Sequence, residues 1–235
     1  NKSFSRSGIR SCTGETPLAF MTHIGIDFSI NSPGCCILSD KGYSFISFFN
    51  YGGRSFEKKI LKAFELHFSL KEGNVIDSIA YDRGPRSKDF LIREREKMID
   101  ATNLSNIIIE YIQENFDSDE YEVYLEGFSY GSKGNSFIDL IQYNSFLRKG
   151  LVNWVGEKNI SVYQPSTVKK TAGKGNANKH YMIKAFQDNV LEDKLLEKTA
   201  IWQWMQGKDY STKIPKPLDD IVDAYFILKT GTLTN

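Results

Sequence analysis

The pattern of apolar and polar residues predicts a chain whose fold begins with three consecutive strands. The run 23–27 is short and mostly apolar, as in a buried strand. Two further runs, 34–38 and 43–49, lie on either side of Asp40-Lys41-Gly42, a sequence typical of a hairpin turn. We therefore expect the sheet to begin with antiparallel strands.

After residue 50, helical and strand patterns alternate. The second half of 87–115 carries an amphipathic stripe, and residues 101–105 leave open whether this stretch is one helix or two. Alternation after an antiparallel start predicts an α/β fold with a mixed sheet. We expect helices over 55–68 (with Ser55 as N-cap), 87–115, 136–155, 166–171, 178–190, 193–205 and 218–228, and strands over 75–81, 121–126 and 160–163.

Length and composition predict one globular domain. The chain has 235 residues, of which 40% are hydrophobic and 25% charged, which suits a soluble α/β domain with or without an insertion. No apolar run reaches the roughly 18–20 residues that cross a bilayer, so we expect no membrane partner. Residues 1–20 lack periodicity, and Met21 directly precedes the first strand. We therefore expect 1–20 to be an extension, a scar or a leader, and 21–235 to be the domain.

The cysteines favour a reducing compartment. The count of three is odd, and Cys35 and Cys36 are neighbours that should point to opposite faces of a strand, while Cys12 lies in the N-terminal extension. We expect no disulfide framework and a cytoplasmic location. No Cys/His spacing suggests zinc.

Four acidic residues occupy positions where a metal site could form. Asp27 and Glu126 end two predicted strands, and the carboxyl ends of strands in an α/β sheet are where sites form. Asp220 and Asp223 are spaced i, i+3 in the last helix, so they share one face. Gathered carboxylates repel one another without a cation, and Mg²⁺ prefers oxygen ligands.

Such a cluster predicts two Mg²⁺ ions that hold the attacking water and the leaving oxygen of a phosphodiester. Asp27 would bridge both ions, Glu126 and Asp223 would complete separate shells, and Asp220 would bind an ion or orient the water. Taken singly, each residue also fits an ordinary turn, edge or helix-capping role, and we assign Asp219 to that capping and dipole role. The joint order of the four is the stronger signal.

Five blocks of sequence extend this pattern. In order and content they resemble the RuvC-type Holliday-junction resolvases, in particular their bacteriophage relatives, over roughly residues 22–230. The blocks are Ile24-Gly25-Ile26-Asp27-Phe28-Ser29 with Asn31, Ser32 and Gly34; Leu125-Glu126-Gly127-Phe128-Ser129-Tyr130-Gly131 with Gly134-Asn135; Pro165-Ser166-Thr167-Val168-Lys169-Lys170; Gly173-Lys174-Gly175-Asn176-Ala177-Asn178-Lys179; and Asp220-Ile221-Val222-Asp223-Ala224.

The resemblance implies a ribonuclease H-like fold with a mixed five-stranded sheet flanked by helices, here with an extra helix–strand insertion at about 51–88. It implies a homodimeric endonuclease that cleaves branched DNA in recombination or repair, using Mg²⁺ or Mn²⁺. On this resemblance Asp27, Glu126, Asp220 and Asp223 are the catalytic carboxylates. Lys179 lies near the scissile phosphate, and Lys169 or Lys170 contacts DNA.

Basic and aromatic residues add candidate DNA contacts. The segment 166–186 holds five lysines and His180 without an acidic residue, although a solvated helix face would look the same. The glycine-lysine loops at 131–134 and 173–176 are suited to phosphate or are ordinary turns. Phe128 and Tyr130 would stack on unpaired bases, or pack against Phe137 or a dimer mate. The candidate DNA-binding residues are Lys133, Lys169, Lys170, Lys174, Phe128 and Tyr130.

Three other functions fit parts of the sequence. An ATPase or sugar-kinase fold shares a Gly-Ile-Asp phosphate loop, but the chain has no second Asp-x-Gly loop. A non-catalytic nucleic-acid-binding or structural protein of the same fold would have little reason to keep all four carboxylates. A nuclease of this fold acting on flaps, forks or RNA–DNA hybrids is not distinguished by the sequence.

Overall fold

The computed structural model describes residues 20–52, 58–84, 86–128 and 134–234, with side chains of 58–64 left out. Within these ranges the chain forms one six-stranded mixed sheet in the order β4-β3-β2-β1-β5-β6. The pairs β1–β2 and β2–β3 are antiparallel, and the pairs β1–β5, β5–β6 and β3–β4 are parallel. The strands are β1 (Met21–Asp27), β2 (Gly34–Ser39), β3 (Gly42–Asn50), β4 (Asp77–Tyr81), β5 (Glu120–Glu126) and β6 (Ile160–Tyr163).

This strand order is that of a ribonuclease H-like sheet with one strand added. The five strands β3-β2-β1-β5-β6 form the predicted core, with the three antiparallel strands on one side and the parallel strands on the other. The sixth strand, β4, comes from the predicted insertion and extends the sheet beyond β3. The fold class expected from the sequence is therefore confirmed.

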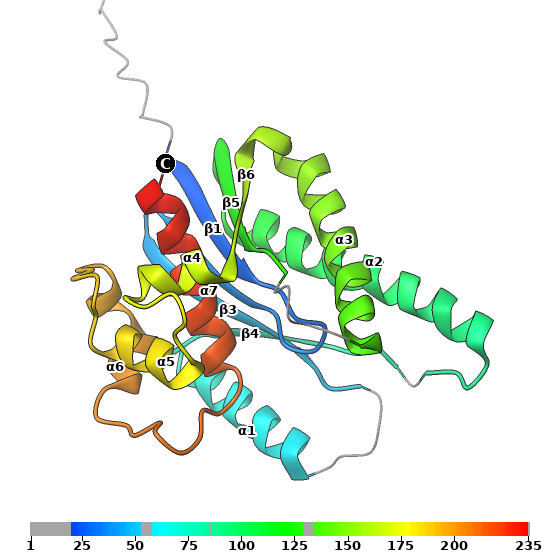
Figure 1. Cartoon of the computed structure of the whole chain (residues 1–235), viewed down its shortest axis with the longest axis horizontal. Helices are drawn as coiled ribbons and strands as arrows, with labels where there is room; N and C mark the ends of the chain where they lie inside the picture. The colour runs from blue at the N-terminus through cyan, green and yellow to red at the C-terminus, as the bar shows by residue number, and fades with distance from the viewer. Residues whose placement is uncertain (1–19, 53–57, 85, 129–133, 235) are drawn as a thin grey trace, which may run out of the picture.

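Helices cover both faces of this sheet (Figure 1). On one face α2 and α3 pack side by side, and on the other α7 lies along β1 and β2 with α4 and α5 against it. None of the described helices is both long and apolar enough to span a bilayer. The helices are α1 (Lys58–Glu72), α2 (Phe90–Asn115), α3 (Asn135–Val155), α4 (Pro165–Thr171), α5 (Lys179–Gln187), α6 (Ala200–Met205) and α7 (Leu218–Thr234), with short 3₁₀ turns η1 (Glu157–Asn159) and η2 (Leu196–Lys198).

Alternation along the strands divides the core into two apolar clusters. Cys35 packs in the cluster under α2 and α3, whereas Cys36 packs in the cluster under α5 and α7. Both thiols are free and buried. They lie on opposite faces of the sheet, as predicted. Cys12 lies outside the described residues.

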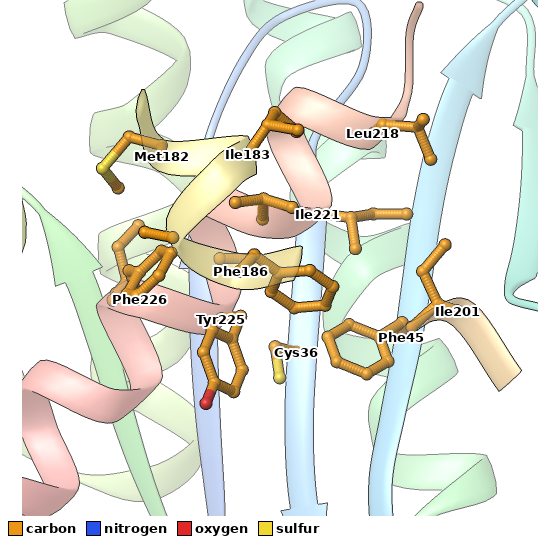
Figure 2. Packing of buried hydrophobic residues seen from close by; sticks show 14 of the residues in the cluster. Cys36, Phe45, Met182, Ile183, Phe186, Ile201, Leu218, Ile221, Tyr225 and Phe226 are labelled. Atoms are coloured by element: carbon orange, nitrogen blue, oxygen red, sulfur yellow. The ribbon is translucent and has the colours of Figure 1, made fainter. Parts of the chain in front are cut away.

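Aromatic rings fill the cluster between α5, α7 and the sheet (Figure 2). The ring of Phe186 meets the ring of Tyr225 edge-on, with centroids 5.2 Å apart, and meets Phe45 from β3 edge-on at 6.2 Å. Each such pair contributes about 0.5–1.5 kcal/mol beyond its buried area. These contacts join α5 and α7 into one layer, which fixes the start of α7 relative to the start of α5.

Two glycines allow α7 to lie directly against the strands. A Cβ atom on Gly25 would meet the backbone oxygen of Ala224 at 2.4 Å and the backbone nitrogen of Leu228 at 2.6 Å. A Cβ atom on Gly34 would meet the backbone oxygen of Asp220 at 2.5 Å. The obstacles are backbone atoms, so they cannot rotate away. Only glycine at these positions permits the observed helix–sheet distance.

The structure answers the open question about 87–115, and it differs from the predictions at the last helix and at 193–205. The stretch 87–115 is one helix, since Ala101, Leu104 and Ser105 are buried and continuous with the rest of α2. The last helix continues past residue 228 to Thr234. The predicted helix over 193–205 is wrong, because only a 3₁₀ turn and the short α6 form there. The predicted N-cap Ser55 lies outside the described residues.

The side chain of Asp193 explains the missing helix. Its carboxylate accepts hydrogen bonds from the Tyr43 hydroxyl at 2.7 Å and the Tyr225 hydroxyl at 3.1 Å, and pairs with Lys229 at 3.1 Å. It also accepts a hydrogen bond from the backbone amide of Leu195 at 3.0 Å. Tyr43, Tyr225 and Lys229 come from distant segments. Together with the local hydrogen bond from Leu195, they hold 193–198 as a turn.

Gly25→Ala should destabilise the protein by about 2–3 kcal/mol, because the added methyl group forces α7 away from β1. Gly42→Ala is the matched control: Gly42 has φ of 98° and nothing within 4 Å of an added Cβ. It should cost only about 1 kcal/mol of backbone strain. Urea unfolding of both variants measures the difference. Equal losses would show that α7 does not depend on this close approach.

Candidate active site

The four predicted carboxylates converge at the carboxyl ends of β1 and β5. Asp27 ends β1 and Glu126 ends β5, and these strands are parallel neighbours in register at Ile26 and Leu125. The first turns of α7 place Asp220 and Asp223 over the same point, since the backbone of Asp220 touches Gly34, which pairs with Asp27. The juxtaposition thus follows from strand register and from the close approach of α7.

Burial and mutual repulsion raise the pKa values of these carboxyl groups. The pKa of Asp27 is raised well above its usual value by burial and then by the charges of Asp223, Asp220 and Glu126, and the charge of Lys216 partly offsets this. Burial also raises the pKa of Asp223, to about 7, with Lys179 opposing the shift and Glu126 adding to it. Asp27 and Asp223 therefore both feel the charges of neighbouring carboxylates, as expected for one cluster.

Two lysines enter this cluster, and only one of them was predicted. Lys179, the first residue of α5, forms an ion pair with Asp219. Lys216, from the segment before α7, forms ion pairs with Asp220 and, at 3.0 Å, with Asp219. Burial would lower the pKa of each lysine, but the neighbouring carboxylates raise both pKa values. In the sequence, Lys216 looks like an ordinary loop lysine between two prolines, so nothing marks it.

Asp219 belongs to the site, and its assignment to helix capping alone is wrong. Its side chain is buried, one oxygen receives both Lys179 and Lys216, and the other oxygen has no hydrogen-bond partner among the described residues. The N-terminus of α7 is itself buried against the sheet, so a first-turn carboxylate points into the cluster rather than into solvent. A buried carboxylate oxygen without a partner is costly and suits a cation or a bound donor.

Ser32 belongs to the first block of the family resemblance, but the sequence assigned it no role in the site. Its hydroxyl donates a hydrogen bond of 2.8 Å to Asp220, and its backbone amide donates to the Ser29 hydroxyl at 3.0 Å. The loop between β1 and β2 therefore orients the carboxylate of Asp220. The sequence pointed to this loop only through that block, which includes Ser29 and Ser32.

The predicted basic residues lie at different depths. Lys169 is half-buried on α4, and its charge lowers the pKa of Glu126 against the larger effect of burial. Lys170 and Lys174 are exposed at the end of α4 and in the loop that leads to Lys179. Backbone hydrogen bonds from Gly173 to Lys170 at 2.8 Å, from Lys174 to Lys169 at 3.2 Å and from Ala177 to Lys174 at 2.9 Å shape this loop. Lys133 lies outside the described residues.

Phe128 is held by neighbouring side chains. Its ring meets Phe137 edge-on with centroids 5.8 Å apart, and the guanidinium of Arg148 lies 5.0 Å from its centroid. This arrangement corresponds to the packing alternative for Phe128, with the ring beside the end of β5. Tyr130, the other candidate for stacking on bases, lies outside the described residues.

The chemistry of the donor set fits a hard divalent cation. The cluster offers only carboxylate oxygens, which Mg²⁺ prefers, and it holds more acidic groups than its lysines neutralise. Among the described residues, no three His, Cys, Asp or Glu side chains are already spaced as ligands of a single ion. Lys216 and Lys179 lie between the carboxylates instead. A cation at these carboxylates would thus compete with the ammonium group of Lys216, which pairs with both Asp219 and Asp220.

Comparisons with known proteins find similarities among solved structures. No protein-family model matches the sequence, and no curated protein matches it. RuvC from Thermus thermophilus is 14% identical with a TM-score of 0.46, and the match covers 91% of this chain and 96% of RuvC. The yeast mitochondrial Holliday junction resolvase Ydc2 is 17% identical with a TM-score of 0.43, and the match covers 88% of this chain and 76% of Ydc2.

Asp27→Asn should stabilise the metal-free protein at pH 8 by on the order of 1 kcal/mol. The pKa of Asp27 is raised on folding, so its ionised form opposes folding above the usual carboxyl range, and the neutral amide does not. The gain should vanish as the pH falls to about 4, where the unfolded carboxyl takes up its proton.

Denaturant unfolding in EDTA measures this gain. The control is Asp40→Asn at the exposed hairpin turn, which should leave stability unchanged within about 0.5 kcal/mol. If Asp27→Asn destabilised the metal-free protein at pH 8, the carboxylates would not repel one another as described.

Proposed function

We propose that this protein is a divalent-metal-dependent endonuclease that cleaves phosphodiester bonds of branched DNA such as four-way junctions. The observation that carries the proposal is the convergence of Asp27, Glu126, Asp220 and Asp223 on one point of a ribonuclease H-like sheet. The choice of branched DNA rests on the sequence resemblance to RuvC-type resolvases.

In this proposal Asp27, Glu126, Asp220 and Asp223 hold two Mg²⁺ ions, for which Mn²⁺ substitutes. When bound, the ions would activate a water and stabilise the leaving oxygen. The protein contributes rigidity: α7 fixes two of the carboxylates against β1, and Ser32 orients Asp220. Lys179, which lies beside Asp219 at the edge of the cluster, would hold a non-bridging oxygen of the scissile phosphate.

The exposed lysines near α4 give a path for the DNA backbone. Lys170 and Lys174 stand on the loop that ends at Lys179, and Lys169 lies beside Glu126. We propose that this loop, together with Lys133, contacts phosphates next to the cleaved bond. Several such contacts would make DNA binding fall steeply with salt.

Cleavage should appear when purified protein is incubated with labelled branched DNA and Mg²⁺, and should be absent in EDTA. The substrates are a four-way junction, a fork, a flap, a linear duplex and an RNA–DNA hybrid. Asp27→Asn should lower the cleavage rate by more than about a hundredfold, the upper range for loss of a group that merely supports a metal ligand. DNA binding by the variant, measured by gel mobility shift, should persist.

Preferred cleavage of a flap, a fork or the hybrid would support the metal-dependent mechanism. It would contradict the choice of four-way junctions as the substrate. Saturable ATP binding with no cleavage of any substrate would contradict the nuclease. Cleavage that survives Asp27→Asn would remove Asp27 from the site.

We also propose that the chain acts as a homodimer, so that two sites address one junction. An apolar stripe, formed by Leu91, Ile92, Met98 and Ile99, is exposed on the first half of α2. The stripe follows i, i+7 spacing on one helix face and lies near the start of α3, which is tied to α2 by the Lys97–Asp139 ion pair of 2.7 Å. An exposed apolar patch of this kind suits a protein interface.

Leu91→Glu should convert the dimer to a monomer, because it places a charge in the middle of the apolar interface. Leu91 is 73% exposed in the single chain. The matched control is Leu233→Glu, because Leu233 is 63% exposed near the end of α7. Light scattering coupled to gel filtration gives the mass of each variant. A wild-type monomer, or a Leu91→Glu dimer, would contradict the interface.

A further inference from the structure

Lys216 brings a positive charge into the middle of the carboxylate cluster. Its ammonium group pairs with Asp220 and lies 3.0 Å from a carboxylate oxygen of Asp219. Its charge also acts on Asp27, across the cluster. Two carboxylates therefore pair with this ammonium group and a third feels its charge, at the place where the proposed function requires a metal cation.

The two sides of this ion pair differ in how freely they can move. The side chain of Lys216 is 42% exposed, whereas those of Asp219 and Asp220 are only 7% and 3% exposed. Lys216 precedes the first residue of α7, so its long side chain can turn into solvent without moving the helix. The carboxylates are fixed by the packing of α7 on the sheet. If the pair separates, the lysine moves.

Lys179 occupies a different position, and it can remain while Lys216 leaves. It pairs with Asp219 through the same oxygen as Lys216, and its backbone belongs to the first turn of α5. When Lys216 turns away, Asp219 keeps one positive partner and Asp220 keeps the hydrogen bond from Ser32. The carboxylate of Asp220 is then the group that is left without a counter-charge.

We propose that Lys216 is a displaceable counter-ion, whose ammonium group neutralises Asp219 and Asp220 in the metal-free protein and is displaced toward solvent when a divalent cation binds. This inference rests on the proposed function, because it requires that the cluster bind a divalent cation. One cation replaces another, and no covalent bond changes. Lys216 therefore stabilises the metal-free fold and lowers the affinity for metal, so that metal binds to a site that is already shaped.

The test compares Lys216→Met, which removes the charge and keeps much of the stem, with Lys213→Met, an exposed lysine in the same segment. Titration calorimetry with Mn²⁺ measures the metal affinity, and urea unfolding in EDTA measures metal-free stability. Lys216→Met should bind Mn²⁺ about tenfold more tightly than wild type, as expected for loss of one competing ion pair. It should also unfold at lower urea in EDTA. Lys213→Met should match wild type in both.

A second variant keeps the inference testable if Lys216→Met does not fold. Lys216→Arg retains the charge and can hold a carboxylate with two hydrogen bonds, so it should bind Mn²⁺ more weakly than wild type. Equal or tighter binding by the arginine variant would overturn the inference, as would an unchanged Mn²⁺ affinity in a folded Lys216→Met.

Those two results would leave the proposed function intact, provided that wild type binds Mn²⁺ and Asp27→Asn does not. Failure of both wild type and Lys216→Met to bind Mn²⁺ would overturn the proposed function and the inference together. If Lys216→Met binds Mn²⁺ and wild type does not, the ammonium group of Lys216 prevents metal binding, which supports the inference.

Discussion

The direct contact between α7 and the strands β1 and β2 is the constraint on which the site depends. Gly25 and Gly34 leave no room for a side chain, so the helix backbone rests on the sheet, with Asp220 opposite Gly34. The aromatic contacts of Phe186 and Tyr225 then hold α5 against α7. Through this packing, residues almost two hundred positions apart, such as Ser32 and Asp220, come within hydrogen-bond distance. The positions of the candidate metal ligands therefore depend on the distance at which α7 packs on the sheet.

The same packing creates an electrostatic cost. Burial and repulsion raise the pKa of Asp27 and of Asp223, which shows that the folded chain opposes full ionisation of its own site. Two lysines reduce this cost from the open side, where their stems remain partly exposed. Buried carboxylates fixed by packing, with partly exposed lysines beside them, suit a site in which one cation replaces another. A site of this kind trades stability for function, as active sites commonly do.

Much of the fold and the main carboxylates could be predicted because they depend on local patterns. Strand alternation placed Asp27 and Glu126 at strand ends, and the i, i+3 spacing placed Asp220 and Asp223 on one face. Asp219 and Lys216 could not be assigned in this way, since their roles arise from the burial of the N-terminus of α7 and from contacts across the cluster. The region 193–198 was missed for a similar reason, because its turn depends on Tyr43, Tyr225 and Lys229 from distant segments. Sequence periodicity reports which face of an element is apolar, and it does not report which polar groups meet.

In the proposed function, α7 and the ends of β1 and β5 together form a site for divalent cations. Anomalous diffraction from crystals grown with Mn²⁺ tests it most directly, because the manganese signal locates the ion without assumptions about the ligands. We expect a peak between Asp27 and the carboxylates of α7, and no peak there in crystals of Asp27→Asn. A wild-type crystal in saturating Mn²⁺ with no peak there, or with manganese only at another place on the molecule, would contradict it.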